Sequence, residues 1–364
     1  MSVITTARGD IDPADLGYTS MHEHLNADFS LMLALIERYS GPQPADNPAT
    51  ALANENLAYL RDGGSMMSPE SSTLGDLGFA TAELRHFAGI GGRAVCDASP
   101  IGLRGDVRIL QEASELADTH VVFATGLYVA DVRPAGLEDP TEETQTALFR
   151  REVLDGVGDT GIRPGFLKCG MSATDPAAPL NEAELRTLRS LARISAETDL
   201  SLHVHTAFPM SLEQVLGVID AALAAGVAAE RLVMMHMDSF LRPWDAITSY
   251  LADMDTPRNV TTEFPRAVLD QGVNIGMDSW SSTVAVLPDD YDRMKGLVDL
   301  LRRGYGSQIA LGHDTTSKPQ GKSYGGYGYT RFGQFVPPLL AQLGFDDDVF
   351  RRLVVDNPAR ILAH

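Results

Sequence analysis

The stretch that organises this chain is Met21-His22-Glu23-His24-Leu25, which ends a short apolar run, residues 16–21, that is predicted to form a buried strand. Side chains alternate between the two faces of a strand, so His22 and His24 point the same way and Glu23 points away. Two imidazoles on one face at a strand end suit a divalent metal ion with nitrogen ligands. An isolated His-x-His pair fits a polar loop equally well. The choice between a metal site and a loop therefore depends on the rest of the chain.

The remainder of the chain alternates short apolar, β-branched runs with longer segments of helical periodicity. Eight strands are expected, at residues 16–21, 93–97, 121–128, 165–169, 200–206, 231–236, 273–278 and 308–313. Strand and helix alternating eight times in 364 residues predict an α/β fold, a (β/α)8 TIM barrel. A doubly wound open sheet is the alternative, but no Gly-x-Gly-x-x-Gly turn follows the first strand, where a dinucleotide-binding sheet usually carries one.

We expect one domain over residues 1–364, with two excursions from this rhythm at about residues 30–75 and 241–271. The first excursion contains runs rich in Pro, Ala, Asn, Gly and Ser around a single helical segment near residues 51–61. Long connections on a barrel are commonly lids and specificity elements. Both excursions are therefore expected to cover the mouth of the barrel and to restrict the substrates that enter it.

Composition and charge exclude several classes of partner. The formal net charge is -20 and the acidic residues are spread along the chain, which disfavours nucleic acid and anionic membrane surfaces. Cys96 and Cys169 are the only cysteines, so the chain offers neither a disulfide framework nor a Cys-based zinc site. No signal peptide is apparent, and no window approaches the ~20 apolar residues of a membrane span. We expect a soluble, cytoplasmic protein that acts on a small molecule.

The residues that carry metal or base chemistry gather at one end of the predicted strands. Barrel enzymes build their active sites at the carboxyl ends of the strands. Six side chains able to bind a metal ion or accept a proton are predicted to lie at these ends: His22, His24, Lys168, His205, His236 and Asp314. Scattered structural histidines would not usually collect there, so the whole set indicates a metal centre.

Lys168 differs from the other five because an ammonium group beside two cations would be repelled. A lysine desolvated near positive charge loses its proton readily. The neutral amine can then add carbon dioxide and become a carbamate, which resembles a carboxylate. We therefore expect Lys168 to be carboxylated and to bridge two metal ions, the alternative being an ordinary lysine paired with an acid.

At this point the motifs as a set resemble a known family. In chain order they are Gly17-Tyr18-Thr19-Ser20-Met21-His22-Glu23-His24-Leu25, Gly91-Gly92, Thr125-Gly126-Leu127-Tyr128, Gly165-Phe166-Leu167-Lys168-Cys169-Gly170, His205-Thr206-Ala207, His236-Met237-Asp238, Gly312-His313-Asp314 and Asn357-Pro358-Ala359-Arg360. Together, from about residue 16 to 362, they resemble the phosphotriesterase-related family of the amidohydrolase superfamily. The set is more specific than any single motif, because each piece falls in order on the expected strand.

The resemblance implies a binuclear, metal-dependent hydrolase. One ion would be held by His22, His24 and Asp314 and the other by His205 and His236, with carboxylated Lys168 and a hydroxide bridging them. A histidine-rich set favours Zn2+, with manganese, cobalt and iron as alternatives. The hydroxide would attack the substrate, and Asp314 would act as the catalytic proton acceptor and shuttle.

Other residues receive narrower predictions. Tyr128 matches a tyrosine that contacts substrate near the metals in the family's lactonases, with an aromatic that merely lines the pocket as the alternative. Trp280, just beyond the seventh strand, is predicted to bind substrate as a pocket wall, with a loop anchor as the alternative. His203 is expected to lie deeper in the barrel, and Asp238 to orient a ligand rather than bind metal. His313, next to Asp314, should point outward toward the helices.

Two departures from the family limit the predicted activity. Phosphotriesterases proper carry a His after the Asp of strand seven and a second Asp beyond strand six, where this chain has Ser279 and Ser239. Lactonases of the family usually have an Arg at the first of these positions. The chain looks closer to the resiniferatoxin-binding-type members, whose name suggests a carboxylic ester or amide ligand.

We therefore expect a hydrolase of carboxylic esters, lactones or amides. A phosphotriesterase and a catalytically silent small-molecule-binding barrel remain as alternatives. The physiological substrate, the metal bound in vivo and the oligomeric state are left open by the sequence, although a homodimer is common in such families.

Overall fold

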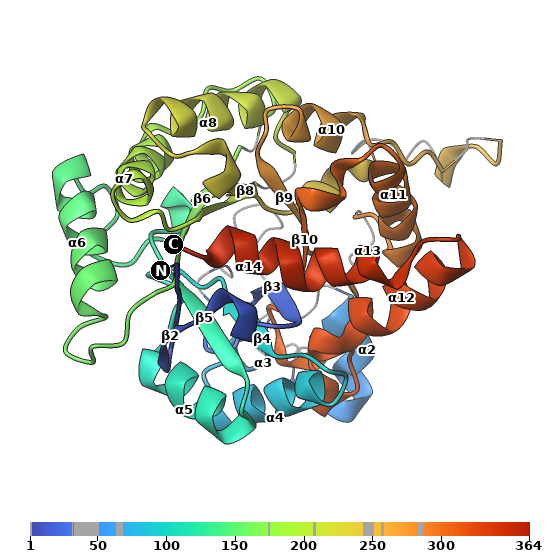
Figure 1. Ribbon diagram of the computed structural model, residues 1–364, viewed down its shortest axis with the longest axis horizontal. Coiled ribbons are helices and arrows are strands. Elements are labelled where there is room, and N and C mark those ends of the chain that lie inside the picture. The colour runs from blue at the N-terminus through green and yellow to red at the C-terminus, as the bar shows by residue number, and fades with distance from the viewer. Residues whose placement is uncertain are drawn as a thin grey trace.

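The computed structural model describes residues 2–30, 32, 51–62, 68–173, 175–206, 209–242, 251–255, 258–282 and 287–364. Its centre is an eight-stranded sheet in which all neighbouring strands are parallel and follow one another in chain order (Figure 1). The strands are β3 (Thr19–Glu23), β4 (Ala94–Asp97), β5 (His120–Thr125), β6 (Phe166–Met171), β7 (Leu202–Thr206), β8 (Leu232–Met234), β9 (Asn274–Met277) and β10 (Ile309–Leu311).

The sheet closes on itself between its first and last strands. The backbone N–H groups of His313 and Asp314, just past β10, donate to the carbonyl oxygen of His22 in β3 at 3.2 and 3.0 Å. Gly312 allows this approach, because a Cβ atom there would lie 2.8 Å from the Cβ of His22. The predicted (β/α)8 barrel is thus confirmed, and the doubly wound sheet is excluded because an open sheet has two free edges.

Helices surround the barrel, as the ring of coiled ribbons in Figure 1 shows. The longer ones are α4 (Leu77–Ala88), α5 (Val107–Ala117), α6 (Glu142–Asp155), α7 (Glu182–Thr198), α8 (Leu212–Ala224), α10 (Glu263–Leu269), α11 (Asp290–Arg302) and α12 (Arg331–Gln342). Most begin at an Asp, Asn, Ser or Thr whose side chain accepts a backbone N–H of the first turn, as Ser211 does for α8. Short helices α2 (Leu57–Arg61), α3 (Pro69–Ser72), α13 (Asp347–Arg351) and α14 (Asn357–Leu362) complete the described part.

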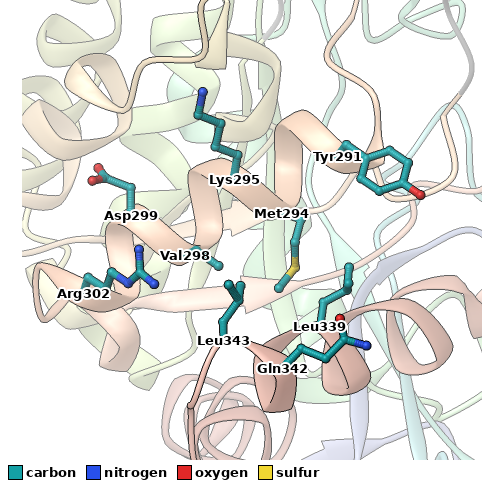
Figure 2. A pocket seen from close by; sticks show the side chains of 9 residues that line it. All are labelled: Tyr291, Met294, Lys295, Val298, Asp299, Arg302, Leu339, Gln342 and Leu343. Carbon is teal, nitrogen blue, oxygen red and sulfur yellow. The ribbon is translucent and has the colours of Figure 1, made fainter.

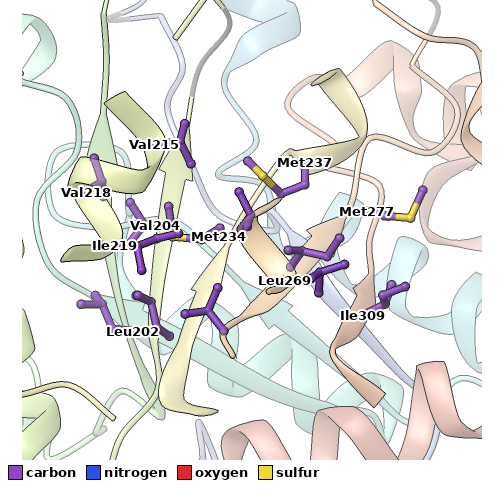
Figure 3. Close-up of a cluster of buried hydrophobic side chains, with 14 of the residues drawn as sticks. Leu202, Val204, Val215, Val218, Ile219, Met234, Met237, Leu269, Met277 and Ile309 are labelled. Carbon is purple, nitrogen blue, oxygen red and sulfur yellow. The ribbon is translucent and has the colours of Figure 1, made fainter. Parts of the chain in front are cut away.

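Alternation along the strands sorts side chains between the barrel interior and the helices. In β6, Leu167 and Cys169 belong to the cluster that packs under the helices, whereas Phe166 belongs to the interior cluster. Figure 3 shows the outer cluster, in which Leu202 and Val204 of β7 pack near Val215, Val218 and Ile219 of α8. Residues two apart from an interior residue therefore also point inward, which places Lys168 above Phe166.

The amino ends of the strands are sealed by apolar residues from both chain ends. Ile4 of the hairpin β1 (Ile4–Thr6) and β2 (Gly9–Ile11), together with Ile361 and Leu362 of α14, belongs to the interior cluster with Met21 and Phe166. The hairpin was not predicted from the sequence. Because this end is packed, polar side chains inside the barrel are directed toward the opposite, carboxyl end of the strands.

Some sequence-based boundaries need correction. The first barrel strand runs over Thr19–Glu23, two to three residues later than predicted, so His22 lies inside it. The expected helix near residues 51–61 is a 3-10 turn (Asn54–Asn56) followed by α2. Within the two predicted excursions, residues 31, 33–50, 63–67, 243–250 and 256–257 lie outside the described residues. Within the described residues, no helix has the length and apolar character needed to cross a bilayer.

A separate groove of about 600 Å³ lies on the outside of the barrel between α11 and α12 (Figure 2). Apolar side chains, among them Met294, Val298 and Leu339, line it, with Lys295 and Arg302 at its rim. None of its lining residues is among the predicted metal ligands, so this groove is distinct from the candidate site.

Candidate metal centre

His22 of β3, His24 one residue past the strand and a carboxylate from the loop after β10 meet at the carboxyl end of the barrel. The Nε2 atom of His24 lies 3.1 Å from Oδ1 of Asp314, and Nε2 of His22 lies 3.4 Å from the same oxygen. One potential ligand atom from each of these residues lies within 4.8 Å of the others. The histidine side chains are buried, whereas that of Asp314 is 26% exposed, so the group reaches solvent through its carboxylate.

Asp278, which follows β9, connects this group to a third histidine. Its Oδ2 lies 2.7 Å from Nδ1 of His22, and its Oδ1 lies 3.1 Å from Nδ1 of His236. The same Oδ1 also accepts the backbone N–H of His236 at 2.9 Å. One carboxylate therefore orients two imidazoles that come from opposite parts of the sequence.

His205 of β7 completes the histidine set. Its ring centroid lies 4.6 Å from that of His236, which in turn lies 4.8 Å from the ring of His22. The hydroxyl of Tyr128 lies 3.3 Å from both ring nitrogens of His205. Tyr128 is thus beside the candidate centre, and its contact with substrate stays a prediction.

Lys168 is buried inside the barrel on β6, where it pairs in register with His203 of β7. Its Nζ atom has no hydrogen-bond partner among the described residues, and the side chain is 1% exposed. Burial lowers the pKa of Lys168 to about 8, although Asp278 and Asp314 oppose the shift. A buried nitrogen without a partner calls for an explanation, because buried polar groups are normally hydrogen-bonded.

The close approach of the β5 loop to Lys168 depends on a glycine. Gly126 has a φ of 141°, and a Cβ atom there would lie 1.8 Å from the carbonyl oxygen of Lys168. No L side chain fits this position without moving the backbone of β6. The Thr125-Gly126-Leu127-Tyr128 motif therefore brings Tyr128 over the strand that carries Lys168.

Burial and neighbouring charges set the protonation of the histidines. Burial, together with the charge of Lys168, lowers the pKa of His22 to about 3. Burial and the charges of His236 and Lys168 hold the pKa of His205 well below its ordinary value. At neutral pH both imidazoles are neutral, as metal ligands must be. For His236 burial also favours the neutral form, but the carboxylates of Asp278 and Asp314 outweigh it and raise the pKa.

The carboxylate of Asp314 is held ionised. Burial alone would raise its pKa, but His22 and His236 lower it below the ordinary range. Asp314 and His236 also share an uncommon backbone conformation, with φ of 53° and 61°. Non-glycine residues in the left-handed region are uncommon, cost free energy and cluster at functional sites. Both residues turn the chain directly after a strand and aim their side chains into the centre.

The carboxyl end of β3 is fixed by its neighbours. Nδ1 of His24 lies 2.8 Å from the hydroxyl of Ser99. The carboxylate of Asp97, at the end of β4, accepts the backbone N–H of Leu25 at 2.9 Å, and the hydroxyl of Tyr329 donates to the carbonyl of His24 at 2.9 Å. These contacts orient His24 before any ligand binds.

Phe29, just before the first excursion, and Arg61, within it, reach this region. The ring of Phe29 stands edge-on to His24 with centroids 4.7 Å apart. The guanidinium Nε of Arg61 donates to the carbonyl of Pro319, in the loop that follows β10, at 2.8 Å. The expectation that this excursion covers the mouth stays a prediction, because most of it lies outside the described residues.

The remaining predicted residues lie behind the centre. His203 is buried one layer below His205, with its ring centroid 4.5 Å from that of Phe166. Trp280 is fully buried, 6.1 Å from the ring of Phe335 in α12, and its role in substrate binding stays a prediction.

Asp238 does not contact a candidate ligand directly but holds the loop after β9. Its carboxylate accepts the backbone N–H groups of Asp278 and Ser279 at 3.3 and 3.1 Å, and the hydroxyl of Ser279 at 3.4 Å. The buried guanidinium of Arg293 donates to it at 2.8 Å. Asp238 therefore positions Asp278, which in turn orients His22 and His236.

Sequence reasoning named Asp278 only as the end of the seventh strand and gave it no role. One signal was available, because Gly276 and Asp278 are two residues apart and share the inward face of β9 in the same way as Phe166 and Lys168 on β6. Its pairing with His22, however, joins positions 256 residues apart and required the folded barrel.

The chemistry of the donor set fits two divalent ions. Four imidazoles and a carboxylate are the nitrogen and oxygen ligands that Zn2+ and related metals prefer. If Lys168 were carboxylated, the carbamate on its Nζ would supply anionic oxygens as further ligands. The roles of His22, His24, Lys168, His205, His236 and Asp314 as ligands stay predictions that this geometry supports.

A family model and several similar known proteins agree on one protein family. A model described as the phosphotriesterase family matches residues 2–362. N-acetyltaurine hydrolases of Salmo salar and Rattus norvegicus are each 24% identical over 363 residues, covering 99% of this chain and 97% of theirs. A phosphotriesterase-related protein of Aedes aegypti is 25% identical over 378 residues, covering 100% of this chain and 99% of its own.

Solved structures give the same result for the fold. A resiniferatoxin-binding protein from Rhodobacter sphaeroides superimposes with a TM-score of 0.81 at 25% identity, covering 99% of this chain and 94% of that one. A lactonase from Listeria monocytogenes superimposes with a TM-score of 0.76 at 22% identity, covering 99% of both chains.

Proposed function

Since the chain belongs to the phosphotriesterase family, we propose that it hydrolyses a carboxylic ester, lactone or amide with the help of two divalent metal ions. The family assignment confirms the predicted enzyme class, a metal-dependent hydrolase. The bond that is cleaved, the identity of the metal and the role of each residue are the parts that we propose.

The observation that carries the proposal is the convergence of Asp314 with histidines from the carboxyl ends of β3, β7 and β8, in a barrel that also buries Lys168. His22 and His24 share Oδ1 of Asp314, and His205 and His236 face each other at 4.6 Å between ring centroids. A structural polar cluster would satisfy its own hydrogen bonds, whereas Lys168 has no partner among the described residues.

We propose that His22, His24 and Asp314 hold one ion, that His205 and His236 hold the other, and that carboxylated Lys168 binds both. When bound, two such ions would lower the pKa of a water molecule and would polarise the carbonyl oxygen of the substrate. Zn2+ is the metal that this donor set favours. Asp278 keeps the imidazoles of His22 and His236 oriented through their other nitrogens.

Protein groups manage the proton and the substrate. Asp314 is ionised and partly exposed, so it can accept a proton at the centre and release it to solvent or to the leaving group. Burial keeps Tyr128 protonated by raising its pKa well above the ordinary value. Its hydroxyl can therefore donate a hydrogen bond to a substrate oxygen beside His205.

The relatives support carboxylic substrates over organophosphates. Their names include N-acetyltaurine hydrolase, whose substrate is an amide, and their matches cover nearly the whole chain. The proton relay of phosphotriesterases would use a His at position 279 and an Asp at position 239. Ser279 instead donates its hydroxyl to Asp238, and neither it nor Ser239 carries a group that relays protons from Asp314.

Turnover assays test the proposal. The protein loaded with Zn2+ in the presence of bicarbonate should hydrolyse at least one member of a panel of N-acyl amides, lactones and carboxylic esters faster than the organophosphates included for comparison. Asp314→Asn should abolish that turnover. Binding of panel members without any turnover would contradict the proposal. It would favour the alternative, a catalytically silent binding protein, which has no need for a complete set of metal ligands.

A further inference from the structure

Glu23, the last residue of β3, lies between the candidate ligands His22 and His24 but faces the opposite way, into the seam where the barrel closes. It is fully buried, and its Oε1 accepts the hydroxyl of Ser20 at 2.5 Å and the backbone N–H of His313 at 3.1 Å. The ring Nδ1 of His313 donates to the same oxygen. Oε2 accepts the backbone N–H of Thr315 at 3.4 Å.

The bonding pattern fixes which nitrogen of His313 carries the proton. Nε2 lies 3.3 Å from the backbone N of Phe332 and accepts its N–H. The proton of the neutral ring therefore resides on Nδ1, which donates a hydrogen bond to Glu23. The imidazole also stacks on the ring of Phe332, with centroids 4.4 Å apart. Through His313, Glu23 is therefore anchored to the first turn of α12.

These contacts bracket Asp314. Glu23 accepts the backbone N–H groups of His313 and Thr315, which precede and follow Asp314 in the chain. The N–H of Asp314 itself donates to the carbonyl of His22, the residue before Glu23. Asp314 needs such support because its φ of 53° costs free energy for a non-glycine residue, and this conformation persists only where the surroundings impose it. One carboxylate thus fixes the backbone from which His22, His24 and Asp314 project.

We propose that Glu23, with His313 as its partner, is a positioning residue for the metal ion assigned to His22, His24 and Asp314 and does not serve the ion assigned to His205 and His236. The inference rests on the proposed binuclear function. It extends that function by naming a group that touches neither metal nor substrate yet sets the affinity of one of the two sites.

The test separates the two sites by removing one ligand at a time. In a His205→Ala background the remaining ion reports the first site, and in a His24→Ala background it reports the second. Adding Glu23→Gln keeps the size of the side chain but turns one acceptor oxygen into a donor that faces other donors. Zn2+ affinity, measured by competition with a chromophoric chelator, should fall about 10- to 100-fold in the first background and stay within about threefold in the second.

Two further variants control for general damage to the fold. His313→Phe keeps the ring on Phe332 but removes the donor to Glu23, and it should weaken the same site in the same direction. Glu83→Gln changes another fully buried carboxylate, which accepts the backbone N–H groups of Lys322 and Ser323 at 2.9 Å each, and it should leave both affinities unchanged. Circular dichroism would verify that each variant is folded.

The outcomes distinguish this inference from the proposed function. If Glu23→Gln lowered both affinities equally or neither of them, or if Glu83→Gln weakened metal binding as much, the positioning role would be wrong while the binuclear site stood. If the unsubstituted protein bound no metal in the presence of bicarbonate, both proposals would be overturned.

Discussion

The carboxylate of Asp278 lies 2.7 Å from Nδ1 of His22, a residue 256 positions earlier in the chain. Its second oxygen lies 3.1 Å from Nδ1 of His236, so Asp278 links the two halves of the candidate centre. An imidazole that is held through one nitrogen presents the other nitrogen in a fixed direction.

We predict that Asp278→Asn weakens metal binding at both sites by about 10- to 100-fold, because an amide has only one acceptor oxygen to share between His22 and His236. Chelator competition with Zn2+ measures the change. Ser279→Ala, one residue further on, alters a weaker contact at 3.4 Å and serves as the matched control. Equal affinities in Asp278→Asn and the unsubstituted protein would show that this carboxylate does not orient ligands.

Tyr128→Phe should retain both metal ions and lower kcat/KM about tenfold, the value of one hydrogen bond of about 1.4 kcal/mol. The hydroxyl lies beside His205 but is not one of the proposed ligands. Steady-state kinetics on the best substrate of the panel, together with metal analysis of the same sample, measure both quantities. Loss of metal with unchanged kinetics per bound ion would assign Tyr128 to metal binding instead.

We predict that the lowered pKa of Lys168 makes the free energy of unfolding depend on pH in protein free of metal and bicarbonate. Its folded pKa of about 8 lies below the value near 10.4 of an unfolded lysine, so between these values the unfolded chain binds more protons. The stability of the unsubstituted protein relative to Lys168→Met should therefore rise with pH, by about 2 kcal/mol between pH 7 and 9.5. Urea unfolding at several pH values measures this difference, and a constant or falling difference would contradict the buried, unpaired ammonium.

Lys168→Ala should lose both metal ions and activity, and short carboxylic acids should partly restore them by taking the place of the carbamate. The restoration is expected because the side chain is fully buried and its removal leaves room at the centre. Retention of two ions per chain by Lys168→Ala would exclude a bridging role. The rescue is measured as activity and metal content with and without added acetate or propionate.

Removal of the metal ions should lower the melting temperature. A ligand that binds only the folded state at 1,000 times its Kd adds about 4 kcal/mol to the free energy of unfolding. Calorimetry before and after treatment with a chelator should show this loss of stability. For Asp314→Asn, which lacks one proposed ligand, the chelator should lower the melting temperature by less. An identical melting temperature for treated and untreated protein would mean that the sample carried no tightly bound ion.

Much of the site followed from strand periodicity. His22 and His24 were placed on one face, Glu23 on the other, and His313 toward the helices, and the structure confirms each of these orientations. Alternation also places His205 on the same inward face as His203, whereas Lys168 is predicted only to lie at the carboxyl end of its strand. These predictions succeeded because a two-residue repeat decides the direction of a side chain once the strand is identified.

The sequence could not indicate contacts that depend on how distant elements pack. Asp278 with His22, and Glu23 with His313, join positions more than 250 residues apart. The hairpin Ile4–Thr6 with Gly9–Ile11 was missed because its short strands lack a long apolar alternation. The first barrel strand was placed too early, because the apolar residue Leu16 belongs to the packing at the base of the barrel and not to the strand itself.

The central claim is that one chain binds two divalent ions at the carboxyl end of its barrel, and elemental analysis of the purified protein tests it most directly. Protein prepared with Zn2+ and bicarbonate should contain about two ions per chain, and Lys168→Ala prepared in the same way should contain far fewer. A ratio near zero in the unsubstituted protein under these conditions would contradict the account.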